Sequence, residues 1–338
     1  MKRIGNLFDT FCSYENLYAA WRKARRGGKR NTESLRFFHQ LEPELFLLHE
    51  ELVAGTWQPQ PYRYFEIHDP KHRTISVAAF RDRVVHHALV NVLEPVYERR
   101  FIFDSYATRR AKGSHAAVAR AQVFMRSNRW FFKSDVEKYF DSIDHQRLMA
   151  ILGRTLKEAR LLTVLEKIIR NSGTAGKGLP IGNLTSQFLA NVYLHPFDVF
   201  LKQELQCRHY LRYMDDFVVF DNDKDHLKQV RLAADHFLQH ELGLHLKPAA
   251  TFFNSAPNGL SFLGKRIFPA AIRLHNHNGR RITRRLRHRE RQWQNGTLND
   301  EDFLESVNSY WALLSWYPFM GLRRHLGVLN CLGAAQHL

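Results

Sequence analysis

The stretch LRYMDDFVVF, residues 211–220, places two adjacent aspartates between two apolar runs. These runs predict the two strands of a β-hairpin with Asp215 and Asp216 at its tip. A bare Asp-Asp pair is most often a solvated turn, and neighbouring carboxylates repel each other. Here apolar strands would hold both charges in a rigid position, so we expect metal ions to neutralise them.

A third carboxylate with an apolar flank lies upstream, in WFFKSDVEKYFDSIDH, residues 130–145. Asp135 follows residues that predict a strand, whereas Asp141 and Asp144 lie beyond it and are interpreted as a helix start. Magnesium prefers hard oxygen ligands and is usually held by a few carboxylates together with substrate phosphates. Three carboxylates at strand ends are therefore candidates for the two divalent ions of a nucleotidyl-transfer site.

The charge balance of the chain points to nucleic acid. Its 338 residues carry 50 Lys and Arg against 33 Asp and Glu, a net charge of +17. This balance favours a polyanionic partner over a generally basic protein. Three scattered cysteines make neither a disulfide framework nor a zinc pattern, and no apolar run suits a leader or a membrane helix. We expect a soluble, cytoplasmic protein.

Hydrophobic periodicity predicts helices that alternate with antiparallel strands. The first 60 residues are predicted to be helical, with Ser13 as a cap and Gly55 as a stop, and residues 62–79 predict a β-hairpin. Short strands are expected around 251–267. The acidic residues are far apart in sequence, so an α+β fold with a small antiparallel sheet would bring them together.

The two acidic motifs carry a family resemblance. RYMDDFVVF resembles the Tyr-x-Asp-Asp hairpin of reverse transcriptases, and SDVEKYFDSIDH is similar to their first catalytic motif in group II intron and other bacterial enzymes. The resemblance runs in the family's order from about residue 60 to 268. It implies a right-hand polymerase with fingers at 1–100, a palm at 101–268 (with about 145–180 belonging to the fingers), and a basic helical thumb at 269–338.

The resemblance also implies roles at the active site. Asp135, Asp215 and Asp216 would hold two Mg²⁺ ions, with Mn²⁺ as an alternative. Val136 would add a backbone carbonyl. Phe140 would occupy the steric-gate position, where an aromatic ring selects deoxynucleotides, although core packing is the plain alternative for a lone Phe.

Further cations resemble the family's nucleotide contacts. Lys71 and Arg73 are similar to the fingers segment that clamps the triphosphate, and two cations on a hairpin suit that task. The family's usual proline after this arginine is Thr74 here. Lys247 would lie near the pyrophosphate as a general acid, with a solvated lysine as the open alternative.

Other segments resemble nucleic-acid contacts of the family. FDSYATRRAKGSHAAV predicts a template or nucleotide pocket, and LSFLGKRIF resembles the primer-grip hairpin. The arginine-rich run RRITRRLRHRER is expected to follow the phosphates of the duplex, because a merely solvated helix would mix charge signs. The predicted nucleic-acid-binding residues are Arg109, Arg110, Lys112, Phe262, Leu263, Gly264, Arg280, Arg281, Arg284, Arg285 and Arg287.

The segment GLPIGNLTSQFLANVYL indicates a subfamily. Group II intron enzymes usually show Gln-Gly-x-x-x-Ser-Pro here, whereas this chain has Ile181, Gly182 and, at the final position, Gln187. All three are predicted to contact the nucleotide. The pattern resembles reverse transcriptases of diversity-generating retroelements. That family implies copying of a template-repeat RNA into cDNA with errors opposite adenines, and a small basic oligomeric accessory protein.

Ile181 suggests a hypothesis for such errors. Glutamine could hydrogen-bond near the nascent pair, whereas isoleucine cannot, so mispairs would be rejected less strongly by about 1–3 kcal/mol. A packed loop residue is the alternative for Ile181. For the whole chain, the alternatives are a retron, defence or group II intron enzyme, a non-catalytic RNA-binding scaffold, and a DNA-templated or template-independent polymerase.

Overall fold

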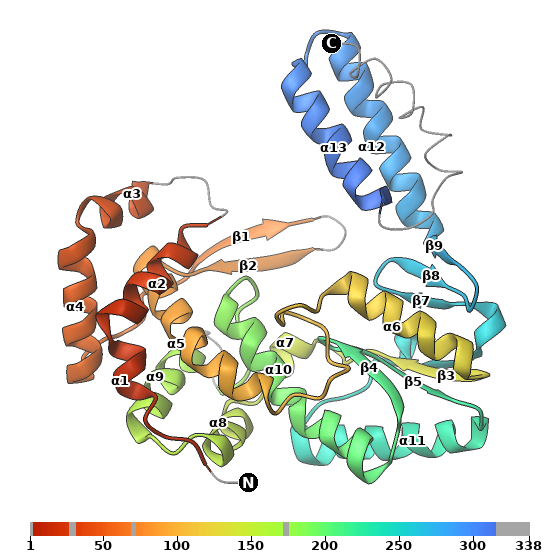
Figure 1. Cartoon of the computed structure of the whole chain (residues 1–338), viewed down its shortest axis with the longest axis horizontal. Helices are drawn as coiled ribbons and strands as arrows, with labels where there is room; N and C mark the ends of the chain where they lie inside the picture. The colour runs from red at the N-terminus through yellow and green to blue at the C-terminus, as the bar shows by residue number, and fades with distance from the viewer. Residues whose placement is uncertain (1–2, 27–31, 69–71, 172–175, 316–338) are drawn as a thin grey trace.

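The computed structural model describes residues 3–26, 32–68, 72–171 and 176–315. Figure 1 shows a group of N-terminal helices, a central region built on a small antiparallel sheet, and two C-terminal helices that rise from its far end. This combination of helices and small antiparallel sheets confirms the predicted α+β class. The predicted boundaries between fingers, palm and thumb stay a prediction.

Five helices form most of the N-terminal part. Ser13 Oγ accepts the Asn16 N–H at 3.3 Å, which confirms the predicted cap. The predicted stop is confirmed as well, because Gly55 ends its helix with φ +74°, a left-handed conformation that favours glycine. The helices are α1 (Phe8–Cys12), α2 (Tyr14–Ala24), α3 (Thr32–His39), α4 (Leu41–Ala54) and α5 (Phe80–Glu98).

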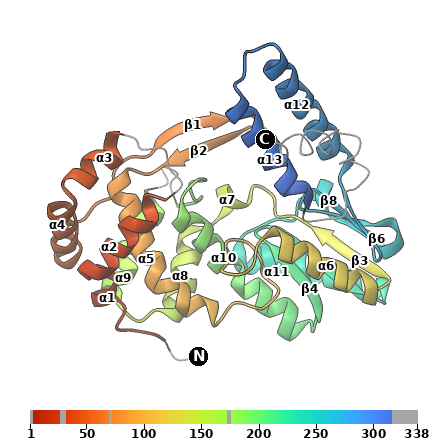
Figure 2. The ribbon, with the colours of Figure 1, turned by 45° about the horizontal axis from the view of Figure 1, so that its top comes forward.

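A two-stranded hairpin projects from these helices. Strands β1 (Arg63–Ile67) and β2 (Arg73–Val77) pair antiparallel, as the sequence predicts for 62–79. Figures 1 and 2 both show the hairpin reaching out from the N-terminal helices. Its base is tied to α3, because Glu33 accepts hydrogen bonds from Arg63 Nη2 at 2.7 Å and from the Phe80 N–H.

The central helices surround the sheet and extend toward the N-terminal part. Asp144 caps α8 by accepting the Arg147 N–H at 3.0 Å, as expected for a helix start. These helices are α6 (Ser114–Ser127), α7 (Tyr139–Ser142), α8 (His145–Thr155), α9 (Ala159–Arg170), α10 (Leu184–Val199) and α11 (Lys224–Phe237). Short π-helical and 3-10 turns follow as η1 (Phe200–Glu204), η2 (Leu238–Leu242), η3 (Pro248–Ala250) and η4 (Ala256–Asn258).

The central sheet has four antiparallel strands in the order β4-β5-β3-β6. Strands β4 and β5 form the predicted Asp-Asp hairpin, and β3 pairs with the other side of β5. The pairing therefore joins segments about 80 residues apart in sequence. The strands are β3 (Trp130–Ser134), β4 (His209–Tyr213), β5 (Asp216–Asp221) and β6 (Phe252–Ser255).

Both faces of this sheet are covered, which explains the continuous apolar run in β5. Val218 and Phe220 pack with residues of α6, such as Phe124. Phe217 and Val219 belong to the main core on the other side, with α10 and α11. Figure 1 shows α6 and α11 on opposite faces. A strand buried on both faces has no solvent-facing positions that would require polar residues.

A smaller sheet connects the central region to the C-terminal helices. Strands β7 (Leu260–Phe262), β8 (Lys265–Ile267) and β9 (Ile272–Leu274) pair antiparallel. Helices α12 (Asn276–Gln294) and α13 (Asp300–Ser315) follow as an antiparallel pair, and Leu286 packs against Phe303 and Val307. The predicted helical tail is confirmed as far as residue 315.

Candidate active site

The sheet brings the three predicted aspartates to one place. Ser134, the last residue of β3, pairs with Phe217, so Asp135 lies across from Asp216 at the same end of the sheet. Met214 and Asp215 form the turn between β4 and β5, and Met214 has φ +57°. Two strands from distant parts of the sequence therefore fix three carboxylates beside one another.

The electrostatics of the cluster show an excess of negative charge. Burial, with the charge of Asp135 and a hydrogen bond to it, raises the pKa of Asp215 to about 7. Burial also raises the pKa of Asp216 to about 6, although the Lys133 ammonium opposes the shift. Lys133 Nζ lies 3.0 Å from Asp216 Oδ1. One lysine thus balances only part of the charge.

This donor set fits a divalent cation. Clustered carboxylate oxygens are the ligands that Mg²⁺ prefers, and a bound ion would offset the cost of burying these charges and the repulsion between them. Val136 could contribute its backbone carbonyl. An isolated β-bridge joins Val136 to Leu246, but its hydrogen bonds use the Asp135 carbonyl and the Glu137 N–H. The Val136 carbonyl is thus not occupied by this bridge.

The same bridge brings Lys247 to the cluster. The Lys247 N–H donates to the Asp135 carbonyl at 2.8 Å, which attaches the backbone of this half-buried lysine directly to the first catalytic-motif residue. The role of its ammonium group as a general acid stays a prediction.

Phe140 lies just beyond the aspartate strand. Lys138 adopts φ +42° and turns the chain into the short helix α7, where Phe140 is half-buried. The rings of Phe140 and Tyr139 meet edge-on, with their centroids 5.7 Å apart. The backbone carbonyl of Phe140 accepts the Leu179 N–H at 2.8 Å. The half-buried ring packs against the main core, and its role as a steric gate stays a prediction.

The loop before α10 packs on the β1–β2 hairpin. Ile181 accepts the Ser76 N–H at 2.7 Å, and Asn183 Nδ2 donates to the Ser76 carbonyl at 3.2 Å. Gly182 has φ +118°, and a Cβ there would lie 2.7 Å from Ile75 Cγ2. The glycine therefore permits a close approach to β2, and the predicted contact of Gly182 with the nucleotide stays a prediction. Gln187 is half-buried in the first turn of α10.

The hairpin tip is described only in part. Arg73 is exposed at the start of β2, whereas Lys71 lies outside the described residues. Glu66, His68 and His72 form a group whose ligand atoms lie within 4.8 Å of one another. All three side chains are exposed, so water competes for the same positions, and we assign this group no role in catalysis.

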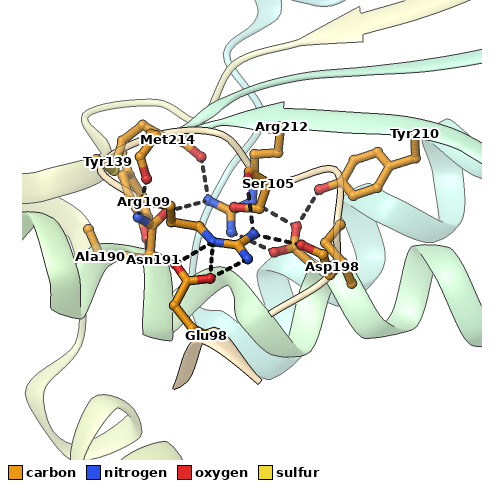
Figure 3. Close-up of polar contacts among 12 residues, drawn as sticks. Glu98, Ser105, Arg109, Tyr139, Ala190, Asn191, Asp198, Tyr210, Arg212 and Met214 are labelled. Atoms are coloured by element: carbon orange, nitrogen blue, oxygen red, sulfur yellow. Dashed lines mark hydrogen bonds and ion pairs between the residues drawn. The ribbon is translucent and has the colours of Figure 1, made fainter. Parts of the chain in front are cut away.

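One predicted nucleic-acid contact is wrong. Arg109 has a side chain only 6% exposed, and its guanidinium pairs with Glu98 at 2.7 Å. It also donates to the carbonyls of Ile102 and Ser105 (Figure 3). A cation with this many internal partners fixes a loop rather than binding phosphate. Lys112 is similarly engaged, because its ammonium donates to the Phe103 carbonyl at 2.9 Å.

Arg110 is exposed and stays a candidate for nucleic-acid binding. The primer-grip prediction needs a correction at Phe262, which is 2% exposed and belongs to the core under α6. Leu263 and Gly264 form the turn between β7 and β8 with φ +48° and +73°. A Cβ on Gly264 would lie 2.6 Å from Asn278 Nδ2, so the turn abuts the start of α12.

Helix α12 presents a strongly basic surface. Its buried side is formed by Ile282 and Leu286. Among the predicted arginines of this helix, Arg281 is half-buried. The exposed ones are Arg280, Arg284, Arg285 and Arg287.

Sequence reasoning missed several residues close to the aspartates. Lys133 pairs with Asp216, and Arg212 pairs with Asp198 under the turn. A charged residue inside an otherwise apolar strand or helix is the signal that could have found them, because such residues are rarely buried without a partner. Asn191 on α10 joins the same contacts.

Comparison with known proteins identifies the family. The family described as "Reverse transcriptase (RNA-dependent DNA polymerase)" matches residues 67–267, more than half of the chain. The chain therefore belongs to the reverse transcriptase family. This confirms the predicted enzyme class, an RNA-directed DNA polymerase, and with it the right-hand architecture.

Two curated relatives share part of this sequence. Protein YkfC of Escherichia coli (strain K12) is 28% identical over 274 residues, which cover 68% of this chain and 72% of that protein. The group II intron-encoded protein LtrA of Lactococcus lactis subsp. cremoris is 27% identical over 203 residues, which cover 57% of this chain and 33% of that protein. The chain thus matches only about a third of LtrA.

Solved structures give a more distant likeness. A telomerase from Candida albicans, in complex with a fragment of telomeric RNA, aligns with a TM-score of 0.48 and 13% identity over 68% of this chain and 51% of that one. An apo telomerase from Candida tropicalis aligns with a TM-score of 0.46 and 14% identity, over 67% and 59%. Separately, each helix in the described ranges is too short or too polar to cross a membrane.

Proposed function

We infer that this chain copies an RNA template into DNA at the cluster of Asp135, Asp215 and Asp216. The main support for this proposal is that the three aspartates lie together at one end of the central sheet. They do so because β3 pairs with β5, with Ser134 opposite Phe217. Three half-buried carboxylates at one place are an unfavourable arrangement without cations. The pKa values of Asp215 and Asp216 are raised, and such shifts are concentrated at functional sites.

The residues around the cluster would act as follows. When bound, two divalent ions, Mg²⁺ or Mn²⁺, would lower the pKa of the primer 3′-hydroxyl and neutralise charge on the triphosphate. The three aspartates and the Val136 carbonyl would hold them. Arg73 would contact the triphosphate, together with Lys71. Lys247 would give a proton to the leaving pyrophosphate.

Selection of the nucleotide would depend on the half-buried ring of Phe140. Its position directly after the aspartate strand would exclude a ribose 2′-hydroxyl. The exposed arginines of α12 would follow the phosphates of the RNA–cDNA duplex, because Arg and Lys neutralise phosphate charge and this helix carries many exposed arginines. We propose that the fingers, palm and thumb correspond to residues 1–100, 101–268 and 269–338.

We further propose that the chain serves a diversity-generating retroelement, in the cytoplasm of a bacterium or of a phage-infected cell. The supporting observation is the sequence from Ile181 to Gln187, which departs from the group II intron pattern at both ends. A template-repeat RNA and a small basic oligomeric accessory protein would be its partners. The relationship to LtrA favours the alternative, a group II intron-type or other bacterial reverse transcriptase.

Sequencing of the cDNA separates these functions. Purified chain, Mg²⁺ and dNTPs are given a primed RNA of known sequence, with and without the co-encoded RNA and accessory protein. Errors concentrated opposite template adenines would support the retroelement assignment. Accurate cDNA would contradict it and favour the alternative, while leaving the polymerase intact.

A further inference from the structure

A buried ion pair lies directly beneath the Asp-Asp turn. Arg212 on β4 and Asp198 on α10 are both fully buried, with 0% of either side chain exposed. Arg212 Nε donates to Asp198 Oδ1 at 2.7 Å, and its Nη2 donates to Oδ2 at 2.5 Å, a bidentate arrangement (Figure 3). The pair joins the Asp-Asp hairpin to α10.

Stability alone is a weak reason for this pair. Removing two charges from water costs several kcal/mol per ion, and apolar residues of similar volume often serve equally well. An arginine offers something that apolar residues lack, because its planar group holds several donors in fixed directions. The remaining donors of Arg212 therefore indicate its purpose.

The remaining nitrogen of this guanidinium group, Nη1, faces the Asp-Asp turn. Arg212 Nη1 donates to the Met214 carbonyl at 2.8 Å, and it also contacts Asn191 Oδ1 at 3.1 Å. Met214 adopts φ +57°, an uncommon conformation for a residue with a side chain. Such a conformation persists when its surroundings over-determine it, and it occurs directly before Asp215.

The contacts extend from the turn to a second segment. Asn191 Nδ2 donates to the Ala107 carbonyl at 2.8 Å, and the Arg212 backbone exchanges hydrogen bonds with Asp104 and Tyr106 at 2.9 Å each. The turn is therefore fixed against both α10 and the 104–107 segment. Helix α10 begins directly after the loop that packs on β2, and its residues Asn191 and Asp198 contact Arg212.

We propose that Arg212, held by Asp198 and Asn191, is a positioning residue that sets the Met214–Asp215 turn in the conformation that binds the divalent ions. This inference rests on the proposed polymerase function. Arg212 acts through the backbone and touches neither nucleotide nor metal. Its loss should therefore weaken metal binding and slow synthesis while affecting nucleotide binding little.

The test compares Arg212→Lys with a matched control, Tyr210→Phe. Lysine keeps the charge facing Asp198 but lacks the planar fork that reaches the Met214 carbonyl at the same time. Tyr210 donates to Asp198 Oδ1 at 2.6 Å, so Phe removes a buried hydrogen bond from the same carboxylate without touching the turn. The control therefore measures the effect of losing one buried hydrogen bond to Asp198 while the contact between Arg212 and the turn is kept.

Mn²⁺ affinity is measured by electron paramagnetic resonance, and cDNA synthesis by steady-state kinetics. We expect Arg212→Lys to bind Mn²⁺ about tenfold more weakly and to lower kcat about 10- to 100-fold, as for other residues that orient metal ligands. Its KM for dNTP should stay within about threefold of the wild-type value. That change is smaller than the expected tenfold loss of Mn²⁺ affinity, which corresponds to about 1.4 kcal/mol. Tyr210→Phe should match the wild type in both assays.

Unchanged Mn²⁺ affinity in folded Arg212→Lys would overturn the proposal, and so would equal losses in Tyr210→Phe. If Arg212→Lys does not fold by circular dichroism, Asn191→Ala is used, and a wild-type Mn²⁺ affinity there also contradicts the proposal. A wild-type chain that makes no aspartate-dependent cDNA defeats the proposed function instead, because Mn²⁺ binding is measured without synthesis.

Discussion

Asp215 is a carboxyl group that the fold keeps near other carboxyl groups despite the cost. Because its pKa is raised from 3.8 to about 7, the folded chain binds this proton more tightly than the unfolded chain does. Stability from this group is present at low pH and is lost as the pH rises from about 4 to about 7.

The variant Asp215→Asn should therefore be more stable than the wild type in metal-free buffer above pH 7, by about 2 kcal/mol. This is roughly half of the value that the pKa shift gives without screening, because solvent screens this half-buried carboxyl group. The difference should shrink toward zero near pH 4, where the wild-type carboxyl is protonated as well. Urea unfolding in EDTA across this pH range measures it. A difference that is independent of pH would contradict the shifted pKa, and Mg²⁺ should stabilise only the wild type.

Gly182 is a residue whose lack of a side chain has a structural reason. A Cβ would lie 2.7 Å from Ile75 Cγ2 and 2.9 Å from the Ser76 carbonyl, on a backbone with φ +118°. We expect Gly182→Ala to lose about 2–4 kcal/mol of unfolding free energy from strain and overpacking together. Gly113→Ala is the matched control, because Gly113 has φ +106° but no atom within 4 Å. Equal losses in the two variants would rule out the packing contact.

Ile181 tests the origin of the proposed errors. If the missing polar contact weakens rejection of mispairs, Ile181→Gln should lower the error rate opposite adenine about tenfold, which corresponds to about 1.4 kcal/mol. Sequencing of cDNA from both proteins on one template provides the comparison. An unchanged error rate would favour the plainer role of Ile181, which is to hold β2 through its carbonyl.

At the scale of elements, α12 is the clearest candidate for duplex binding. Each phosphate contact contributes about 0.9 to the slope of log affinity against log salt concentration. The double variant Arg284→Ala/Arg287→Ala should therefore reduce that slope by about 1–2. Fluorescence anisotropy with an RNA–DNA duplex measures it.

The control for this experiment is Arg154→Ala/Arg231→Ala, which removes two exposed arginines from α8 and α11. That variant should keep the wild-type slope. An equal reduction in both double variants would mean that the net charge of the chain, rather than the surface of α12, determines binding.

Strands and helices with strong local signals could be predicted from the sequence. The caps at Ser13 and Asp144, the stop at Gly55 and the Asp-Asp hairpin depend on neighbouring residues, and the structure has all of them. The convergence of Asp135 on that hairpin is predicted by the apolar strand before it, and the family resemblance implies the same arrangement. It also required strand ends to meet at one edge, which β3 and β5 do.

What the sequence could not reveal depends on tertiary partners. Arg109 lies in a basic segment of the sequence, as an exposed phosphate-binding arginine would. Only its ion pair with Glu98 in the folded chain shows that its side chain is buried. Phe262 lies in a turn-rich segment, yet α6 covers it. Arg212 was hidden for the same reason, because its partners Asp198 and Asn191 come from another element.

At the scale of the whole molecule, the N-terminal helices, the central sheet and the α12–α13 pair form three parts (Figures 1 and 2). The acidic cluster lies at one end of the central sheet. Loop 181–183 packs on the β1–β2 hairpin, and α10 connects that loop to the catalytic turn. One helix thus connects these two segments, so we expect changes at either end to affect the reaction proposed for this chain.

Primer extension on an RNA template tests the central claim most directly. The wild type and an Asp215→Asn/Asp216→Asn variant, both shown to be folded, are given Mg²⁺, dNTPs and a primed RNA, with the co-encoded RNA and accessory protein in parallel. We predict cDNA from the wild type and at least a thousandfold less from the variant, about 4 kcal/mol of lost transition-state stabilisation. Equal synthesis by both proteins, or none from the wild type even with its partners, would contradict a polymerase centred on these aspartates.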